Sequence, residues 1–197
     1  MKYTDKTDKL EEYIRNNLKE SRYLHSLGVE KMARHLAGIH GADEEKAAFA
    51  GRYHDIAKCK TAYEMNDLVR KYQLSEEYLD NPALAHSKVG AALLKYEFGV
   101  NDKDIINAVS SHTTGRAGMS LLEEIVYVSD AIDETRSYGG IEDLRKQAET
   151  DLDGACLFIM DFTIDKLKNE GRTLDKITLD ARDFIYNRII HKIDKEK

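Results

Sequence analysis

The sequence has very little proline and very little cysteine. Pro82 is the single proline in 197 residues, so long stretches are free to form uninterrupted helices. The two cysteines, Cys59 and Cys156, lie far apart and neither belongs to a C-x-x-C pair, which argues against a disulfide framework and favours spectator thiols over metal ligands. Free thiols are typical of a reducing compartment, and we therefore expect a cytoplasmic protein.

Long apolar runs are missing as well. No stretch approaches the ~20 apolar residues needed to span a bilayer, and the polar N-terminus lacks the apolar core of a signal peptide. The formal net charge of -6 argues against nucleic acid as the main partner. It still allows a small phosphorylated ligand, because a metal ion and a few local cations can outweigh the field of the whole protein.

Apolar residues recur with the helical period along the chain, and strand patterns are hard to find. We therefore predict an all-α protein, and the length suits one domain with a real core. Residues 1–20 are predicted to form an amphipathic helix packed on that domain, with Asp8 and Glu11 arranged like a capping box. Residues 21–197 are predicted to form the domain itself.

The stretch AAFAGRYHDIAK places an adjacent ionisable pair, His54-Asp55, at the end of a small and apolar helix. Burying such groups is costly unless they have a partner, and a metal ion would serve both. Helical spacing puts three more histidines and one aspartate on apolar faces, and these are His25, His86, His112 and Asp130. Mixed imidazole and carboxylate ligands favour iron, manganese, zinc and similar divalent ions over calcium.

Each of these residues also has a simpler interpretation. A single histidine on an apolar face is more often a hydrogen-bonded core residue than a ligand, and His35, His40 and His191 are assigned to the core or the surface. Asp130 alone would be explained by a pair with Arg136. Five such positions on separate predicted helices, however, favour a metal site at the centre of the bundle.

The order His25, His54-Asp55, Asp130 resembles the signature of the HD-domain metal-dependent phosphohydrolases. Longer segments, SRYLHSLGVEKMA, HDIAK, AHSKVGA, SHTTGRAGMSLLEEIVYVSDAIDETR and EGRTLDKITLDARD, resemble the bacterial HD-domain symmetrical bis(5'-nucleosyl)-tetraphosphatases. Members of this family were formerly described as predicted HD-superfamily hydrolases linked to NAD metabolism. The resemblance implies a single HD-domain helical bundle and covers nearly the whole chain after residue 20.

Carried over position by position, the resemblance implies four metal ligands, and these are His25, His54, Asp55 and Asp130. The metal would be iron or another divalent transition metal such as manganese or cobalt. His86 and His112 would lie on the open side of the ion. There they would hold a second metal, contact phosphate or donate a proton. Lys58 and Arg136 would supply positive charges that bind phosphate oxygens. Weaker candidates for nucleotide contacts are Thr113, Gly171 and Asp175.

The resemblance implies that the protein hydrolyses diadenosine tetraphosphate into two ADP, with the metal activating water. Another HD phosphohydrolase acting on nucleoside mono- or polyphosphates and a non-catalytic nucleotide sensor are the alternatives. The expected partners are the dinucleoside polyphosphate and ADP, and the expected assembly is a monomer or homodimer. One departure concerns the family's usual Ile-Glu-Pro run, where this chain has Ile132-Asp133-Glu134.

Overall fold

The computed structural model describes residues 4–172 and 174–195 of the chain. Within these ranges the protein contains ten α-helices, one 3-10 turn and no strand, which confirms the all-α prediction. The elements are α1 (Thr4–Asn17), α2 (Glu20–His40), α3 (Glu44–Tyr53), α4 (Ala62–Lys71), η1 (Glu76–Tyr78), α5 (Pro82–Tyr96), α6 (Lys103–Ser111), α7 (Leu121–Ile132), α8 (Ile141–Thr150), α9 (Leu152–Asn169) and α10 (Lys176–Lys195).

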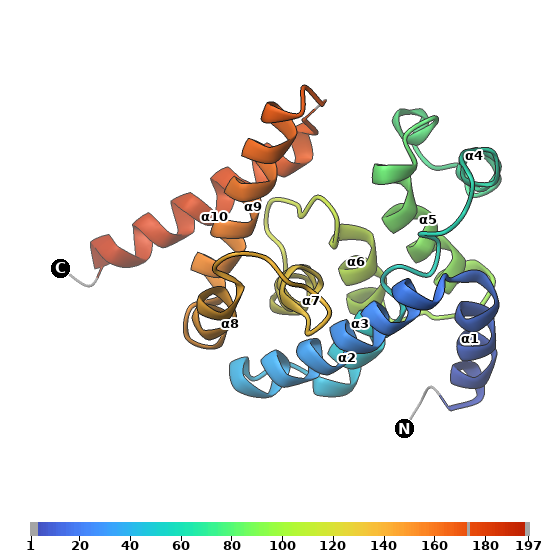
Figure 1. The fold of residues 1–197 in the computed structure, drawn as a ribbon, viewed down its shortest axis with the longest axis horizontal. Helices are drawn as coiled ribbons and strands as arrows, with labels where there is room; N and C mark the ends of the chain where they lie inside the picture. Colours follow the sequence, from blue (N-terminus) through green and yellow to red (C-terminus); the bar gives the residue numbers. More distant parts are fainter. Residues whose placement is uncertain (1–3, 173, 196–197) are drawn as a thin grey trace.

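Helix α7 is the central element of the bundle (Figure 1). It packs against α2, α3, α6, α8 and α9, and most of its residues are buried. Helices α4 and α5 lie to its right in Figure 1, and α9 and α10 lie to its left. Because α7 carries Asp130 near its C-terminal end, this carboxylate lies at the edge of the buried part of the helix.

Side-chain caps begin several of the helices that position the site. Asp43, Asn81, Asp102 and Ser120 each accept a hydrogen bond from a backbone N–H in the first turn of α3, α5, α6 and α7. The first two of these helices lead to the His54-Asp55 pair and to His86. Short polar side chains at these positions thus set where each ligand-bearing helix starts.

The N-terminal helix begins earlier than its predicted cap. Because α1 starts at Thr4, Asp8 lies inside the helix, and the predicted capping box with Glu11 is wrong. The Glu11 carboxylate accepts hydrogen bonds from Arg52 Nη2 at 2.6 Å and from the Tyr23 hydroxyl at 2.5 Å. Leu10 and Ile14 on the same helix are fully buried in the main core, so α1 packs closely on α2 and α3.

Glycine allows α3 to pack closely on α2. A Cβ atom on Gly51 of α3 would lie 2.9 Å from the Val29 carbonyl oxygen of α2, a distance that no real side chain tolerates. The absence of a side chain therefore brings α3, and the His54-Asp55 turn after it, against α2.

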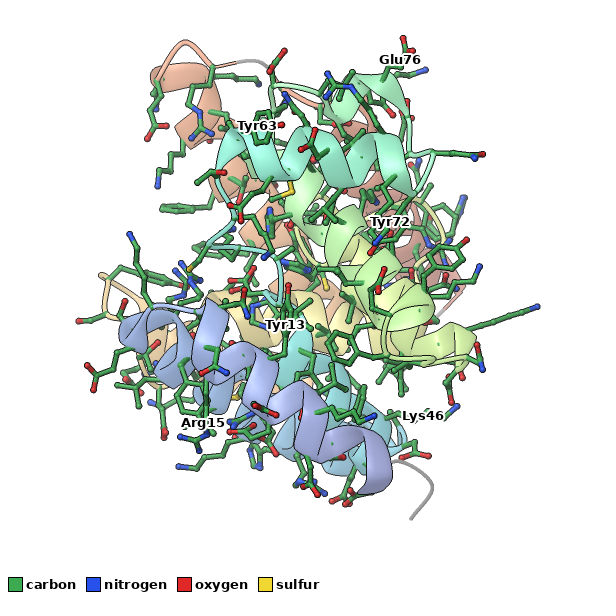
Figure 2. All side chains as sticks on the ribbon, turned by 90° about the vertical axis from the view of Figure 1, so that its right-hand side faces the viewer. Tyr13, Arg15, Lys46, Tyr63, Tyr72 and Glu76 are labelled. Carbon is green, nitrogen blue, oxygen red and sulfur yellow. The ribbon has the colours of Figure 1, made fainter. Side chains whose placement is uncertain are left out.

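A second, smaller apolar cluster joins α4 to α5 and contains Met65, Val69 and Val89. Tyr13 of α1, drawn between α1 and α4 in Figure 2, borders a shallow hollow with Leu68 of α4 and Leu93 of α5. None of the helices in the described part of the chain is long and apolar enough to cross a membrane.

Candidate metal centre

Five separate parts of the chain bring six ionisable side chains together. His25 lies on α2, His54 and Asp55 form the turn after α3, and His86 lies on α5. His112 directly follows α6, and Asp130 lies on α7. We call the complete set the His/Asp cluster, and it consists of His25, His54, Asp55, His86, His112 and Asp130. All are buried except Asp130, whose side chain is 23% exposed.

Asp55 is the centre of the His/Asp cluster. Its Oδ1 lies 3.2 Å from His86 Nε2 and 3.4 Å from His112 Nε2. Its Oδ2 lies 3.4 Å from His54 Nε2 and 3.9 Å from His25 Nε2. One carboxylate therefore faces two pairs of imidazoles, one pair on each oxygen.

Asp130 completes one side of the cluster. Its Oδ1 lies 3.0 Å from His25 Nε2 and 3.7 Å from His54 Nε2. Burial alone would raise the pKa of Asp130, but the neighbouring imidazoles of His25 and His54 hold it well below its usual range. Asp130 is therefore a carboxylate, the form that binds a cation.

All four histidines of the cluster are oriented in the same way. The Nδ1 atoms of His54, His86 and His112 donate to the backbone carbonyls of Gly51, Pro82 and Val109 at 2.7, 3.3 and 2.7 Å. His25 Nδ1 donates to a carboxylate instead. Because Nδ1 donates in each ring, Nε2 is the nitrogen that is directed at the centre of the cluster, where a metal would bind.

Three buried atoms of the cluster test whether the residues fit an ion. His25 Nε2, His54 Nε2 and Asp55 Oδ1 have no hydrogen bond of acceptable geometry within residues 4–172 and 174–195, although other cluster atoms lie 3 to 4 Å away. Buried polar atoms are nearly always paired, so three orphans in one place require a partner. A cation between them would supply it.

The protonation states point the same way. Burial would raise the pKa of Asp55, but the neighbouring imidazoles of His54, His112 and His86 hold it well below its usual range. Burial lowers the pKa of His112 to about 4, which keeps that ring neutral at pH 7. Burial would also lower the pKa of His25, but the neighbouring Asp130 and Asp133 carboxylates raise it overall. A metal ion and this proton compete for one lone pair, so metal binding is expected to release the proton.

Three groups of side chains have ligand atoms close enough to share one ion. They are His25, His54 and Asp55; Asp55, His86 and His112; and His54, His112 and Asp130. The first two groups share Asp55, so the cluster can accommodate one ion or two. The donor set fits a divalent transition metal, because neutral imidazole and carboxylate together suit such ions.

An elongated cavity of about 370 Å³ opens beside the cluster. Lys58, His112, Thr113, Asp130 and Arg136 line it at the cluster end. Its other wall carries aromatic rings, and we call it the aromatic cavity, with walls formed by Tyr138, Phe158 and Phe162. The rings of the first and last of these stack at 6.2 Å between centroids with planes 14° apart.

Lys58 and Thr113 both lie close to the imidazoles of the His/Asp cluster, and their phosphate and nucleotide contacts stay a prediction. Lys58 Nζ lies 3.0 Å from His86 Nε2 and 3.8 Å from Asp55 Oδ1. Thr113 Oγ1 lies 3.1 Å from His86 Nε2 and 3.2 Å from His112 Nε2. The Lys58 side chain is 35% exposed, yet its ammonium is directed at the cluster.

Arg136 is held at the entrance of the aromatic cavity. Its Nη2 donates to Asp130 Oδ1 at 2.8 Å and its Nε donates to the Asp130 carbonyl at 3.0 Å. The side chain is 38% exposed, so part of the guanidinium faces the cavity. Asp130 does pair with Arg136, but this pair does not fully describe its surroundings, because the same oxygen also faces His25.

Asp133 is a site residue that sequence reasoning left without a role. It occupies the position of the family's usual glutamate, is fully buried, and accepts from His25 Nδ1 at 3.0 Å. Gly28 makes room for it, because a Cβ there would lie 2.6 Å from Asp133 Oδ1. Glu134 instead forms a surface ion pair with Lys31 at 2.7 Å. Asp133 is therefore the carboxylate that orients His25.

We expect Asp133→Asn to lower metal affinity by roughly 10- to 100-fold, as is typical when the partner of a metal-binding histidine is lost. Asp133 Oδ1 accepts from the Thr135 N–H and hydroxyl while Oδ2 accepts from His25, and the single oxygen of an amide cannot serve both, so His25 is no longer fixed in the tautomer that directs Nε2 at the metal. Chelator competition measures the affinity. Glu134→Gln, which removes the neighbouring surface carboxylate, is the matched control and should leave it unchanged. Equal affinities in both variants would contradict this role.

Other predicted nucleotide contacts lie further along the chain. Gly171 is in the connection between α9 and α10, where its φ of 63° ends α9. Asp175 accepts from the Ile177 N–H at 2.7 Å and so starts α10. Neither residue is among those that line the aromatic cavity, and their nucleotide contacts stay a prediction. Thr173, inside the same loop, lies outside the described residues.

With this geometry the chain can be compared with known proteins. A family model described as HD domain matches residues 22–135, the stretch that contains the whole His/Asp cluster. A protein of Bacillus subtilis named symmetrical bis(5'-nucleosyl)-tetraphosphatase is 43% identical over 145 residues, which cover 73% of this chain and 78% of that protein. One of the same name from Halalkalibacterium halodurans is 36% identical over 90% of this chain and 93% of its own length. The chain therefore belongs to the HD-domain family, within the group that contains these bacterial tetraphosphatases.

A solved structure supports the same assignment. A predicted HD-superfamily hydrolase involved in NAD metabolism, from Clostridium acetobutylicum, superposes with a TM-score of 0.88. It shares 41% sequence identity, and the match covers 92% of this chain and 97% of that one. The resemblance inferred from the sequence motifs is thereby confirmed, and so is the HD-domain bundle.

Proposed function

We propose that this protein is a metal-dependent hydrolase that cleaves diadenosine tetraphosphate symmetrically into two ADP. The observation that carries the proposal is the aromatic cavity, whose far wall suits a nucleobase and whose near end joins the His/Asp cluster, Lys58 and Arg136. The names of the relatives at 36% and 43% identity support the choice of substrate. Residues 21–197 would form the hydrolase domain, and residues 1–20 a helix packed on it.

His25, His54, Asp55 and Asp130 would hold the metal ion, and His86 and His112 would complete a second position with Asp55. Iron, manganese or cobalt fits these donors. Such an ion supplies Lewis acidity, which lowers the pKa of bound water and offsets charge on phosphate oxygens. A cytoplasmic location fits the two free cysteines.

The chain's own cations would act on the phosphate groups. Arg136 presents a planar fork at the cavity entrance, and such a fork matches two phosphate oxygens at once. Lys58 lies near Oδ1 of Asp55, whereas His25 lies near Oδ2, and the lysine adds a second positive charge. Because both are fixed before substrate arrives, they can stabilise the charge that develops on the non-bridging oxygens.

The polar rim of the cavity would orient the phosphate chain, while its rings hold the base. Thr113 offers a hydroxyl beside His86 and His112. At the far wall, the stacked Tyr138 and Phe162 rings expose π faces, which bind any nucleobase by stacking. The Tyr138 hydroxyl is fixed on the Ala131 carbonyl at 2.9 Å, so this ring is held in place.

Product analysis tests the proposal. Metal-loaded protein incubated with diadenosine tetraphosphate should give ADP as the only early nucleotide product. Equal amounts of ATP and AMP would refute symmetrical cleavage. Tight ADP binding without cleavage in the presence of iron, manganese or cobalt would identify a nucleotide sensor. Release of nucleoside or inorganic phosphate from mononucleotides would identify another HD phosphohydrolase.

A further inference from the structure

A second cavity of about 370 Å³ shares Lys58 with the aromatic cavity. Its lining consists of Lys19, Ser21, Arg22, Lys58, Cys59 and Lys60. Four of these side chains are positively charged and none is acidic, in a chain whose net charge is -6. We call it the basic cavity, and it lies where α2 begins and where the turn after α3 leads to α4.

The basic cavity directly adjoins the His/Asp cluster. Arg22 Nη1 donates to Asp55 Oδ2 at 2.8 Å, and Lys58 Nζ lies 3.8 Å from Asp55 Oδ1. Two of the four cations therefore contact the central carboxylate of the cluster. An anion bound among these cations would lie next to a metal held by Asp55.

The two cavities differ in the chemistry of their walls. The aromatic cavity offers rings for a base and Arg136 for phosphate. The basic cavity has no ring in its lining, and its charged groups are all ammonium or guanidinium groups. A ligand that occupies both would therefore have an aromatic group at one end and a run of negative charge that continues past the metal.

We propose that the basic cavity binds the phosphate groups of the second nucleotide half of a dinucleoside tetraphosphate, while the aromatic cavity holds the first half. This inference rests on the proposed function. Cleavage at the centre of four phosphates leaves two on each side of the scissile bond, so the phosphates of the departing ADP need cations beyond the metal. Lys19, Arg22 and Lys60 supply them.

The backbone and neighbouring side chains keep these cations at the cavity. Lys60 lines both the basic cavity and the hollow beside Tyr13. Its Nζ donates to Asn17 Oδ1 at 3.2 Å, lies 5.5 Å from the centroid of the Tyr13 ring and lies 4.0 Å from Glu64 Oε1, so it is held between α1 and α4. Lys19 precedes the first turn of α2 and makes no side-chain cap there. The positive end of the α2 dipole therefore adds to the field of the lysines.

A variant that removes two of these charges separates the second half-site from the first. In Lys19→Gln/Lys60→Gln, the KM for diadenosine tetraphosphate should rise about tenfold, which corresponds to about 1.4 kcal/mol of binding free energy. Inhibition by ADP should stay within about twofold of the wild type, because ADP needs only the aromatic cavity. Metal content and melting temperature report whether the fold is intact.

Lys95→Gln/Lys103→Gln is the matched control. These lysines line a different surface hollow, at the ends of α5 and α6 that point away from His86 and His112. Each lies nine residues from its histidine, which is roughly 13 Å along a helix. The control removes the same charge and should leave the KM unchanged.

Cys59 provides a readout that does not depend on turnover. It is half-buried in the lining of the basic cavity, whereas Cys156 is fully buried. A non-hydrolysable analogue, with a methylene group between the two central phosphorus atoms, should slow alkylation of Cys59 by at least about tenfold. ADP at saturation should slow it by less than about twofold.

The possible outcomes are distinct. An unchanged KM in Lys19→Gln/Lys60→Gln would overturn the proposal, and so would equal losses for the tetraphosphate and ADP, which would indicate general attraction of anions. Equal protection of Cys59 by ADP and the analogue would also overturn it. If the wild type did not form ADP, the proposed function would fail, but protection of Cys59 would still decide whether the tetraphosphate occupies the basic cavity.

Discussion

Asp55→Asn is expected to strip the protein of its metal and to lower turnover by a factor on the order of 10³, equal to about 4 kcal/mol of transition-state stabilisation. Asp55 belongs to two of the three possible ligand groups and faces an imidazole pair with each oxygen. An amide has only one acceptor oxygen, and its NH₂ group would face the remaining pair. Elemental analysis and turnover on diadenosine tetraphosphate measure the two effects.

Asp153→Asn is the matched control for this substitution. Asp153 on α9 is also largely buried, with its side chain 12% exposed, and it accepts from Lys192 at 2.6 Å. It takes no part in the His/Asp cluster, so its loss should affect stability and leave the metal in place. A full complement of metal in Asp55→Asn would contradict the assignment of Asp55 as the central ligand.

Arg136→Ala is expected to retain metal but to lower kcat by about 10²- to 10³-fold, the usual effect of removing one fixed donor from a site of developing charge. Its guanidinium is oriented by Asp130 and borders the aromatic cavity. Arg136→Lys should recover only part of the rate, because an ammonium keeps the charge but loses the planar fork.

The effect should appear in kcat more than in KM, because the proposed contact strengthens in the transition state. Arg182→Ala provides the control. Arg182 on α10 also pairs with an aspartate, Asp161 at 2.8 Å, but lies outside both cavities. Wild-type turnover of Arg136→Ala at saturating substrate would show that Arg136 does not stabilise the transition state.

Local sequence was sufficient to predict the helical class and to single out all six residues of the His/Asp cluster. The caps at Asp43, Asn81, Asp102 and Ser120 act within one turn of themselves, so their partners are only two or three residues away. Helical spacing likewise shows which histidines share a face with apolar residues. The same local rule failed at Asp8, where α1 extends one turn further toward the N-terminus than the capping pattern indicated.

Contacts between distant segments were beyond such rules. Asp133 is 108 residues from His25, and Arg22 is 33 residues from Asp55. Each pair meets because α7 and α2, or α2 and the turn after α3, pack at a particular angle and height. A shift of one residue in either helix would rotate the side chain away by about 100°, and no local pattern contains that information.

The candidate metal ligands could therefore be recognised from the sequence, because the ability to bind a metal depends on the residue type and its position on a helical face. The two cavities were not. The aromatic cavity draws on α7, α9 and the segment between α7 and α8, and the basic cavity on the start of α2 and the turn after α3. Their walls exist only after the helices pack, because each cavity is lined by residues that are far apart in the sequence.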